Sequence, residues 1–96
     1  MAQELRIGEV TFSVQAEGSG PPIVFIHGWS MSGRFFRRQL SHFAAAHRVI
    51  IPDLRGHGRS EKVLHGHTVP NYAADLHAIL AELSVRRPVL VGWSMG

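Results

Sequence analysis

Three short apolar runs, each followed by a segment that contains glycine or proline, set the strongest limit on how this chain can fold. The runs are Ile23–Ile26, Val49–Ile51 and Val89–Val91, and all of them contain β-branched residues. Continuous apolar sequence of this length is typical of strands that are covered on both faces. We therefore expect three buried strands, the second of which is broken by Pro52.

Amphipathic segments separate these runs. From Arg34 to Ala45 the apolar residues fall mainly on one helical face, and Ser32 is the expected N-cap. A second helix is expected to start near Thr68, with Pro70 in its first turn, where proline is tolerated. The apolar stripe of this second helix consists of Ala73, Leu76, Ile79, Leu80 and Leu83. Strands that alternate with amphipathic helices predict right-handed crossovers and a parallel sheet with helices on both faces.

Two further strands are expected before the first buried run. Residues 9–16 partly alternate between polar and apolar side chains, as in a strand with one wet face, and residues 3–7 are similar. We expect these two strands to pair antiparallel, before the turn-forming segment 17–22. The predicted fold class is thus α/β, a mostly parallel sheet with helices on both faces and an antiparallel N-terminal strand pair.

Composition narrows the possible classes of function. The chain has 96 residues, of which 45% are apolar and 18% charged, enough for one small globular domain. It has no cysteine, so disulfides and thiolate metal sites are excluded. The net charge of +3 comes from scattered basic residues, so we do not expect nucleic acid as a partner. Without a signal-peptide pattern or an apolar run of bilayer length, we expect a cytoplasmic protein that does not contact membranes.

The segment Gly92–Gly96 follows the last apolar run and carries the clearest chemical signal. Ser94 lies two residues from a glycine on either side, which is the pattern of a nucleophile elbow, where a strand turns sharply into a helix. Such a turn strains the backbone of the serine and points its hydroxyl away from the sheet, while the glycines allow close approach. The alternative is an ordinary turn with a surface serine, because the pattern arises by chance in about 3% of chains this long.

Two other motifs follow the earlier buried strands. His27-Gly28 comes directly after the first strand, and Asp53–Ser60 (DLRGHGRS) comes after the second. Together with Gly92–Gly96, they resemble the amino-terminal part of an α/β-hydrolase fold protein, over residues 1–96. The resemblance is greatest to the esterase, lactonase and cofactor-free haloperoxidase branch, which uses Gly-x-Ser-Met-Gly elbows. A serine here argues against the haloalkane dehalogenase and epoxide hydrolase branches, whose nucleophile is an aspartate.

The resemblance implies a role for each matching position. Ser94 would be the nucleophile, and the backbone N–H groups of Trp29 and Met95 would form the oxyanion hole. The indole of Trp29 would be a wall of the acyl pocket or simply part of the core. His27 would shape the oxyanion loop through hydrogen bonds rather than act in a catalytic triad. The glycines with a structural role at the site would be Gly28, Gly92 and Gly96.

Other residues of the motifs are expected to have structural roles. Gly56 and Gly58 would allow a tight loop after the second buried strand. The residues expected to brace that loop are Asp53, Arg55 and His57. The pair His65 and His67 has no cysteine or carboxylate at ligand spacing, so solvated loop histidines are favoured over a metal site. We expect neither a metal nor a cofactor.

The triad acid and the triad histidine are not in this chain, because in this fold both follow the serine in sequence. A serine at its free pKa is a poor nucleophile, so we expect no turnover by these 96 residues alone. The helix of the elbow is also missing, which would leave nothing to hold the strained turn. Trp93 and residues 89–91 would lie at an open sheet edge, an expected aggregation site.

Three functions stay open. The first is a serine hydrolase of carboxylic esters, lactones or related acyl compounds that works through an acyl-serine intermediate. The second is a cofactor-free haloperoxidase or perhydrolase, in which peroxide intercepts the acyl-serine to give a peracid. The third is a non-catalytic hydrolase-like protein or fragment that acts through binding. The first two predict a small-molecule acyl compound as the partner, and the sequence leaves the oligomeric state open.

Overall fold

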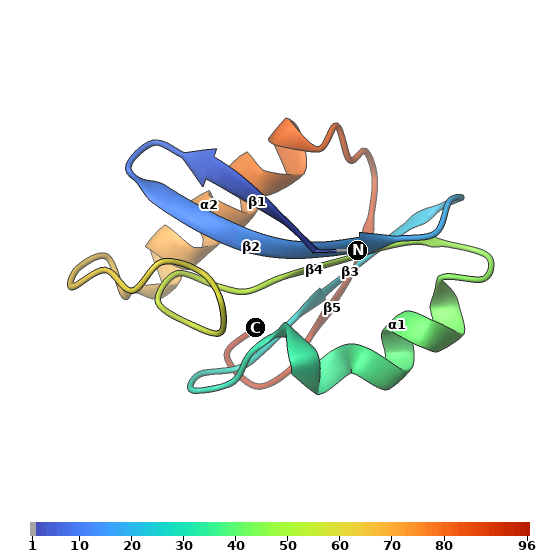
Figure 1. Ribbon diagram of the computed structural model, residues 1–96, viewed down its shortest axis with the longest axis horizontal. Coiled ribbons are helices and arrows are strands. Elements are labelled where there is room, and N and C mark those ends of the chain that lie inside the picture. Colours follow the sequence, from blue (N-terminus) through green and yellow to red (C-terminus); the bar gives the residue numbers. More distant parts are fainter. Residues whose placement is uncertain (1) are drawn as a thin grey trace.

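A computed structural model of the chain describes residues 2–96 (Figure 1). Its elements in chain order are β1 (Ala2–Ile7), β2 (Val10–Glu17), β3 (Pro22–Ile26), the 3-10 helix η1 (Gly33–Phe36), α1 (Arg37–Phe43), β4 (Arg48–Pro52), α2 (Val69–Glu82) and β5 (Val89–Gly92). The strands form one five-stranded sheet in the order β1-β2-β4-β3-β5. The expected order, two strands and then strands that alternate with helices, is confirmed.

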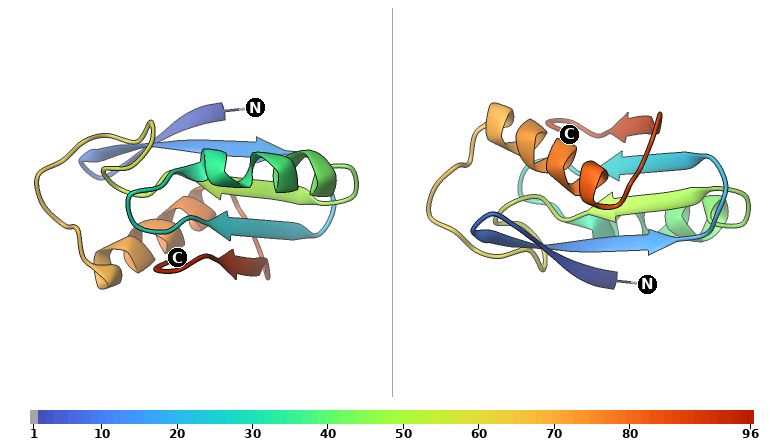
Figure 2. Two further views of the ribbon diagram at one scale, coloured as in Figure 1. Left: turned by 90° about the horizontal axis from the view of Figure 1, so that it is seen from below. Right: turned by 90° about the horizontal axis from the view of Figure 1, so that it is seen from above.

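The sheet is mixed in the way the sequence predicts. β2 pairs antiparallel with β1 and with β4, whereas β3 is parallel to both of its neighbours, β4 and β5. In this register Ile23 of β3 lies between Val49 of β4 and Val89 of β5. Because β3, β4 and β5 run in the same direction, their carboxyl ends lie at the same edge of the sheet (Figure 2). The three motifs that follow these strands are therefore brought to one edge.

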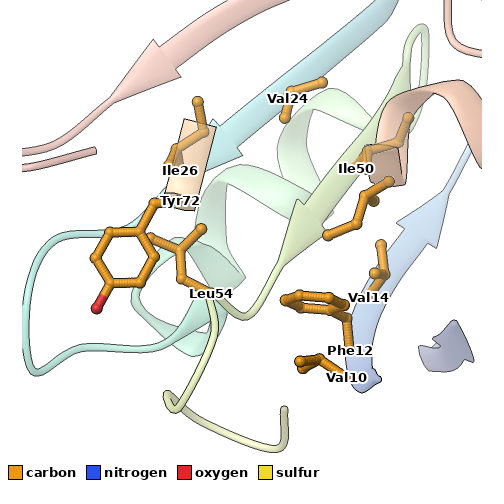
Figure 3. Packing of buried hydrophobic residues seen from close by; sticks show 9 residues of the cluster. Val10, Phe12, Val14, Val24, Ile26, Ile50, Leu54 and Tyr72 are labelled. Carbon is orange, nitrogen blue, oxygen red and sulfur yellow. The ribbon is translucent and has the colours of Figure 1, made fainter. Parts of the chain in front are cut away.

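The two α-helices cover opposite faces of the sheet (Figure 2). Successive strand residues point to opposite faces, so each buried strand contributes to two core clusters. On the α2 side the buried cluster consists of Val10, Phe12, Val14, Val24, Ile26, Ile50, Leu54, Tyr72 and Ile79 (Figure 3). On the α1 side it consists of Ile23, Phe25, Phe36, Leu40, Val49 and Ile51. The prediction that the first two apolar runs are covered on both faces is confirmed.

The third apolar run differs from the prediction of a fully buried strand. Val89 is 61% exposed, Leu90 55% and Val91 38%, because among residues 2–96 β5 is an edge strand that pairs with β3 only. A run of β-branched residues shows that a strand suits burial, but it does not show whether a neighbouring strand is present. The other prediction for this segment, an open sheet edge that includes Trp93, is confirmed by the 53% exposure of that indole.

The first helix begins with a tighter turn than predicted. Residues 33–36 form η1 and the α-helix follows only from Arg37, ending at Phe43 rather than at residue 45. Ser32 is the N-cap, as expected, and its hydroxyl accepts a hydrogen bond from the N–H of Arg34. A Cβ on Gly33 would lie 2.7 Å from the side chain of Ile51, so the start of η1 packs directly on β4. Thr68 caps α2 in the same way. Within residues 2–96, every helix is too short or too polar to cross a bilayer.

Candidate functional site

Ser94 lies in the turn that directly follows β5, and its φ angle is +57°. The left-handed region costs a residue with a side chain about 1–2 kcal/mol, so the strained serine expected from the sequence is present. The N–H of Gly96 donates to the carbonyl of Trp93 at 2.9 Å, and the N–H of Trp93 donates to the carbonyl of Ile26 at 3.1 Å. The expectation that nothing would hold this turn is therefore wrong, because these two backbone hydrogen bonds close it and attach it to β3.

The three site glycines lie where no side chain fits easily. A Cβ on Gly92 would collide with the carbonyl of Gly96, and a Cβ on Gly96 would collide with the carbonyl of Ile26. A Cβ on Gly28, in the loop after β3, would lie only 3.1 Å from the Cβ of Ser94. The loop after β3 and the turn after β5 are thus in direct contact beside the serine.

Two backbone N–H groups near Ser94 have no hydrogen-bond partner. Met95 directly follows Ser94, and Trp29 directly follows Gly28, the residue that contacts Ser94. Within the described residues neither the Trp29 N–H nor the Met95 N–H donates a hydrogen bond. Free N–H groups on either side of a nucleophile can stabilise the negative charge that develops on a carbonyl oxygen under attack.

His27 is fully buried and connects the loops after β3 and β4. Its Nδ1–H donates to the carbonyl of Gly28 at 2.8 Å, and its Nε2 accepts the N–H of Leu54 at 3.0 Å. A carbonyl only accepts and a backbone N–H only donates, so these contacts define the neutral tautomer. Burial lowers the pKa of His27, although the hydrogen bond to the Gly28 carbonyl acts in the opposite direction. With both ring nitrogens engaged, His27 has no free nitrogen with which to take a proton from Ser94.

The loop after β4 is braced by hydrogen bonds to Asp53. The Oδ1 atom of Asp53 accepts the N–H of Gly33 at 2.6 Å, and Oδ2 accepts the N–H of Arg59 at 2.9 Å. The hydroxyl of Ser60 donates to the Asp53 carbonyl. The φ angle of Gly58 is +52°, and a Cβ there would collide with the Asp53 carboxylate. The bracing and the tight turn predicted for this motif are both observed.

An ion pair that the sequence did not reveal ties the same loop to α2. Arg55 donates to Asp75 through Nε and Nη2, both at 2.9 Å, and the two side chains are only 16% and 9% exposed. The hydrogen bonds to Asp75 raise the pKa of Arg55. Tyr72, Asp75 and Ile79 are all buried and share one face of α2. An acidic residue at helical spacing on an apolar face was the signal that could have identified this pair.

Trp29 is not part of the core. Its indole is 55% exposed and lies 5.3 Å from the His57 ring, measured between ring centroids, in an edge-to-face arrangement. Together with Ser30, Gly56 and His67, these two side chains line a surface hollow of about 360 Å³. Of the two readings of the indole, a wall of a hollow or part of the core, the second is wrong.

His67 also differs from the prediction. Its Nε2 contacts the carbonyl of Val63 at 2.7 Å and its Nδ1 contacts the hydroxyl of Tyr72 at 3.2 Å, so both ring nitrogens are engaged. It is a half-buried structural residue, whereas His65 is exposed as expected. Burial raises the pKa of Tyr72. No cluster of three or more possible metal ligands occurs in the part of the chain that the structure describes.

A second hollow, of about 220 Å³, lies between α2 and the turn that carries Ser94. Its lining is almost entirely apolar and consists of Ile26, Leu54, Val69, Tyr72, Ala73, Leu76, Met95 and Gly96. Met95 therefore has an unpaired backbone N–H and a side chain that faces an apolar space.

Known proteins are similar to this chain in both amino-acid sequence and backbone fold. The chain is 49% identical over 80 residues to the non-heme haloperoxidase of Rhodococcus erythropolis, a match that covers 82% of this chain and 29% of that protein. It superposes with a TM-score of 0.94 on the bromoperoxidase of Bacillus anthracis, with 34% identity over the whole chain and 36% of the Bacillus protein. An N-acyl homoserine lactonase complexed with N-butanoyl homoserine also gives 0.94, at 33% identity, covering the whole chain and 37% of the lactonase.

The chain spans about a third of the length of these relatives. Residues 21–96, which include all three motifs and the contacts around Ser94, match the family described as alpha/beta hydrolase fold. This match covers more than half of the chain, and the mixed sheet agrees with it. The chain belongs to the α/β-hydrolase fold family.

Proposed function

We propose that the chain is the nucleophile-bearing part of a serine hydrolase that acts on carboxylic esters, lactones or related acyl compounds. The observation that carries the proposal is the left-handed Ser94 after β5, in contact with Gly28. The residues that follow Gly28 and Ser94, Trp29 and Met95, each have a backbone N–H without a hydrogen-bond partner among residues 2–96. Hydrolase-type relatives such as the lactonase support the reaction class. The cytoplasmic location and the small-molecule acyl substrate are part of this proposal.

In the proposed reaction the Oγ of Ser94 attacks the carbonyl carbon of the substrate. The carbonyl oxygen becomes an oxyanion, which accepts hydrogen bonds from the N–H groups of Trp29 and Met95, each worth about 3 kcal/mol of the barrier. The leaving group departs with a proton, and water then hydrolyses the acyl-serine. Transfer of the proton from the Ser94 hydroxyl to the leaving group requires a histidine that is oriented by an acidic residue. His27 cannot be this histidine, because both of its ring nitrogens are engaged. We propose that residues 1–96 alone do not turn over substrate.

The second candidate is a cofactor-free haloperoxidase or perhydrolase, and the haloperoxidase relatives favour it. Its first step is the same attack by Ser94, but hydrogen peroxide replaces water as the acceptor of the acyl group. The products are then a peracid and free Ser94. Acetate-dependent bromination in the presence of peroxide, absent without acetate, would favour this candidate over simple hydrolysis.

The test uses the protein expressed from its start codon to the natural stop codon of its gene. We expect a fluorophosphonate to label it, and we expect the Ser94→Ala variant to lose the label. Ser84→Ala is the matched control, because Ser84 is also exposed and also has a left-handed φ angle, +55°, but precedes β5, whereas Ser94 follows that strand. Labelling that survives in Ser94→Ala would refute the proposal. A gene product without labelling would favour a non-catalytic protein, and the 96-residue chain alone is expected to stay unlabelled.

A further inference from the structure

His57 has a free hydrogen-bond acceptor in an otherwise satisfied environment. The side chain is only 9% exposed, and its Nδ1 lies 2.9 Å from the carbonyl of Arg55. Because a carbonyl only accepts, Nδ1 carries the proton and Nε2 of the neutral ring has a lone pair. Nε2 has no hydrogen-bond partner among residues 2–96, yet it is not sealed from solvent.

The two histidines nearest to His57 differ from it, because neither has a free ring nitrogen. Both ring nitrogens of His27, whose ring centroid lies 5.1 Å from that of His57, are engaged. The same holds for His67 on the other side of the hollow. Of these three imidazoles, only His57 offers an atom to a ligand. A group this buried is usually hydrogen-bonded, so an open acceptor here indicates a place for a donor from outside residues 2–96.

The hollow that His57 lines also restricts the rest of the ligand. Its other lining residues are Trp29, Ser30, Gly56 and His67, with no carboxylate, lysine or arginine side chain among them. The exposed indole of Trp29 provides a flat apolar surface directly beside His57. The backbone N–H of the same Trp29 is one of the two donors proposed for the oxyanion. Among residues 2–96 the hollow therefore offers a ligand no charged side chain, and it shares Trp29 with the proposed oxyanion hole.

We propose that His57 is a substrate-binding residue, whose Nε2 accepts a hydrogen bond from a hydroxyl or amide N–H of the substrate while a flat or apolar part packs on Trp29. This proposal rests on the proposed function, because the bound molecule is a substrate only if Ser94 is the nucleophile. It names the substrate class as uncharged acyl compounds that carry an O–H or N–H donor. An analogue without the donor would leave Nε2 desolvated and unpaired, which is a strong basis for discrimination.

The test compares two probes that differ only in the donor, 2-phenylethanol and its methyl ether. Dissociation constants come from titrations followed by the imidazole ¹⁵N resonances of the protein. We expect the alcohol to bind about tenfold more tightly than the ether and to shift the Nε2 signal of His57, which the ether leaves in place. In His57→Phe, which keeps a flat ring beside Trp29, the ratio of the two constants should fall to about one. His65→Phe, at an exposed histidine outside the hollow, should keep the tenfold ratio.

Equal affinities in the unsubstituted protein, absence of binding by both probes, or a preference that survives in His57→Phe would each overturn the inference. If His57→Phe does not fold, the Nε2 shift in the unsubstituted protein decides the matter alone. A protein that binds the alcohol at His57 but is not labelled at Ser94 would refute the proposed function and leave the donor site standing.

Discussion

Replacing His27 by leucine tests whether this histidine holds the loops of the site together. The change keeps a buried apolar side chain but removes the acceptor for the Leu54 N–H and the donor to the Gly28 carbonyl. Leu54 is 2% exposed, so its orphaned N–H should cost about 1–3 kcal/mol. The Gly28 carbonyl still accepts the N–H of Met31 at 3.2 Å, so its lost bond should cost only about 1 kcal/mol. We expect a total loss of about 2–4 kcal/mol.

Urea unfolding followed by tryptophan fluorescence measures this loss, with His65→Leu as the control at an exposed histidine. The control should change the free energy of unfolding by less than about 0.5 kcal/mol. His27→Gln supplies an amide oxygen near the position of Nε2 and should recover part of the stability if His27→Leu does not fold. A loss below about 0.5 kcal/mol in His27→Leu, with the Leu54 amide resonance unmoved, would refute the reasoning.

Three further predictions concern stability. Burial lowers the pKa of His27 below the value of 6.5 that it has when unfolded, so the unfolded chain binds the proton more readily. The free energy of unfolding should therefore fall as the pH drops below about 6.5, by at most about 1.4 kcal/mol per pH unit. Urea titrations at several pH values should show a weaker pH dependence of this free energy in His27→Leu. Arg55→Met leaves the buried Asp75 carboxylate unpaired and should lower the free energy of unfolding by about 3 kcal/mol. The double variant Arg55→Met with Asp75→Leu should lose less, and equal losses in the two variants would contradict a buried ion pair. Gly8 and Gly58 have φ angles of +60° and +52°, but only a Cβ on Gly58 meets other atoms, so thermal unfolding should show Gly58→Ala less stable than Gly8→Ala by about 1 kcal/mol or more.

Much of the fold could be predicted because local patterns dominate it. The apolar runs of β3 and β4 are buried on both faces, and Ser32 caps the first helix, as their residue types indicate. Within residues 2–96 β5 is exposed rather than buried, because burial depends on a neighbouring strand, which a strand's own sequence does not contain. The tight start of the first helix was also missed, and there Gly33 lies against Ile51, a contact that the local sequence does not show.

In the candidate site, too, features set by a local motif could be predicted, whereas contacts between separate segments could not. The strained Ser94 and the close glycines follow from a local motif, so the sequence was sufficient to expect them. The partner of Arg55 lies on α2, as does one of the two partners of His67, the hydroxyl of Tyr72. The acidic residue on the apolar face of that helix is visible in the sequence, but the side chain that reaches it is not. The free nitrogen of His57 was equally hidden, because it depends on which carbonyl occupies the other side of the ring.

The most direct test of the account is a crystal structure of the gene product with a phosphonate bound covalently to Ser94. The phosphonyl oxygen stands in for the oxyanion of the proposed intermediate. The account predicts that this oxygen lies about 2.7–3.1 Å from the backbone nitrogens of both Trp29 and Met95. An adduct whose phosphonyl oxygen contacts neither nitrogen, or an adduct on a residue other than Ser94, would contradict it.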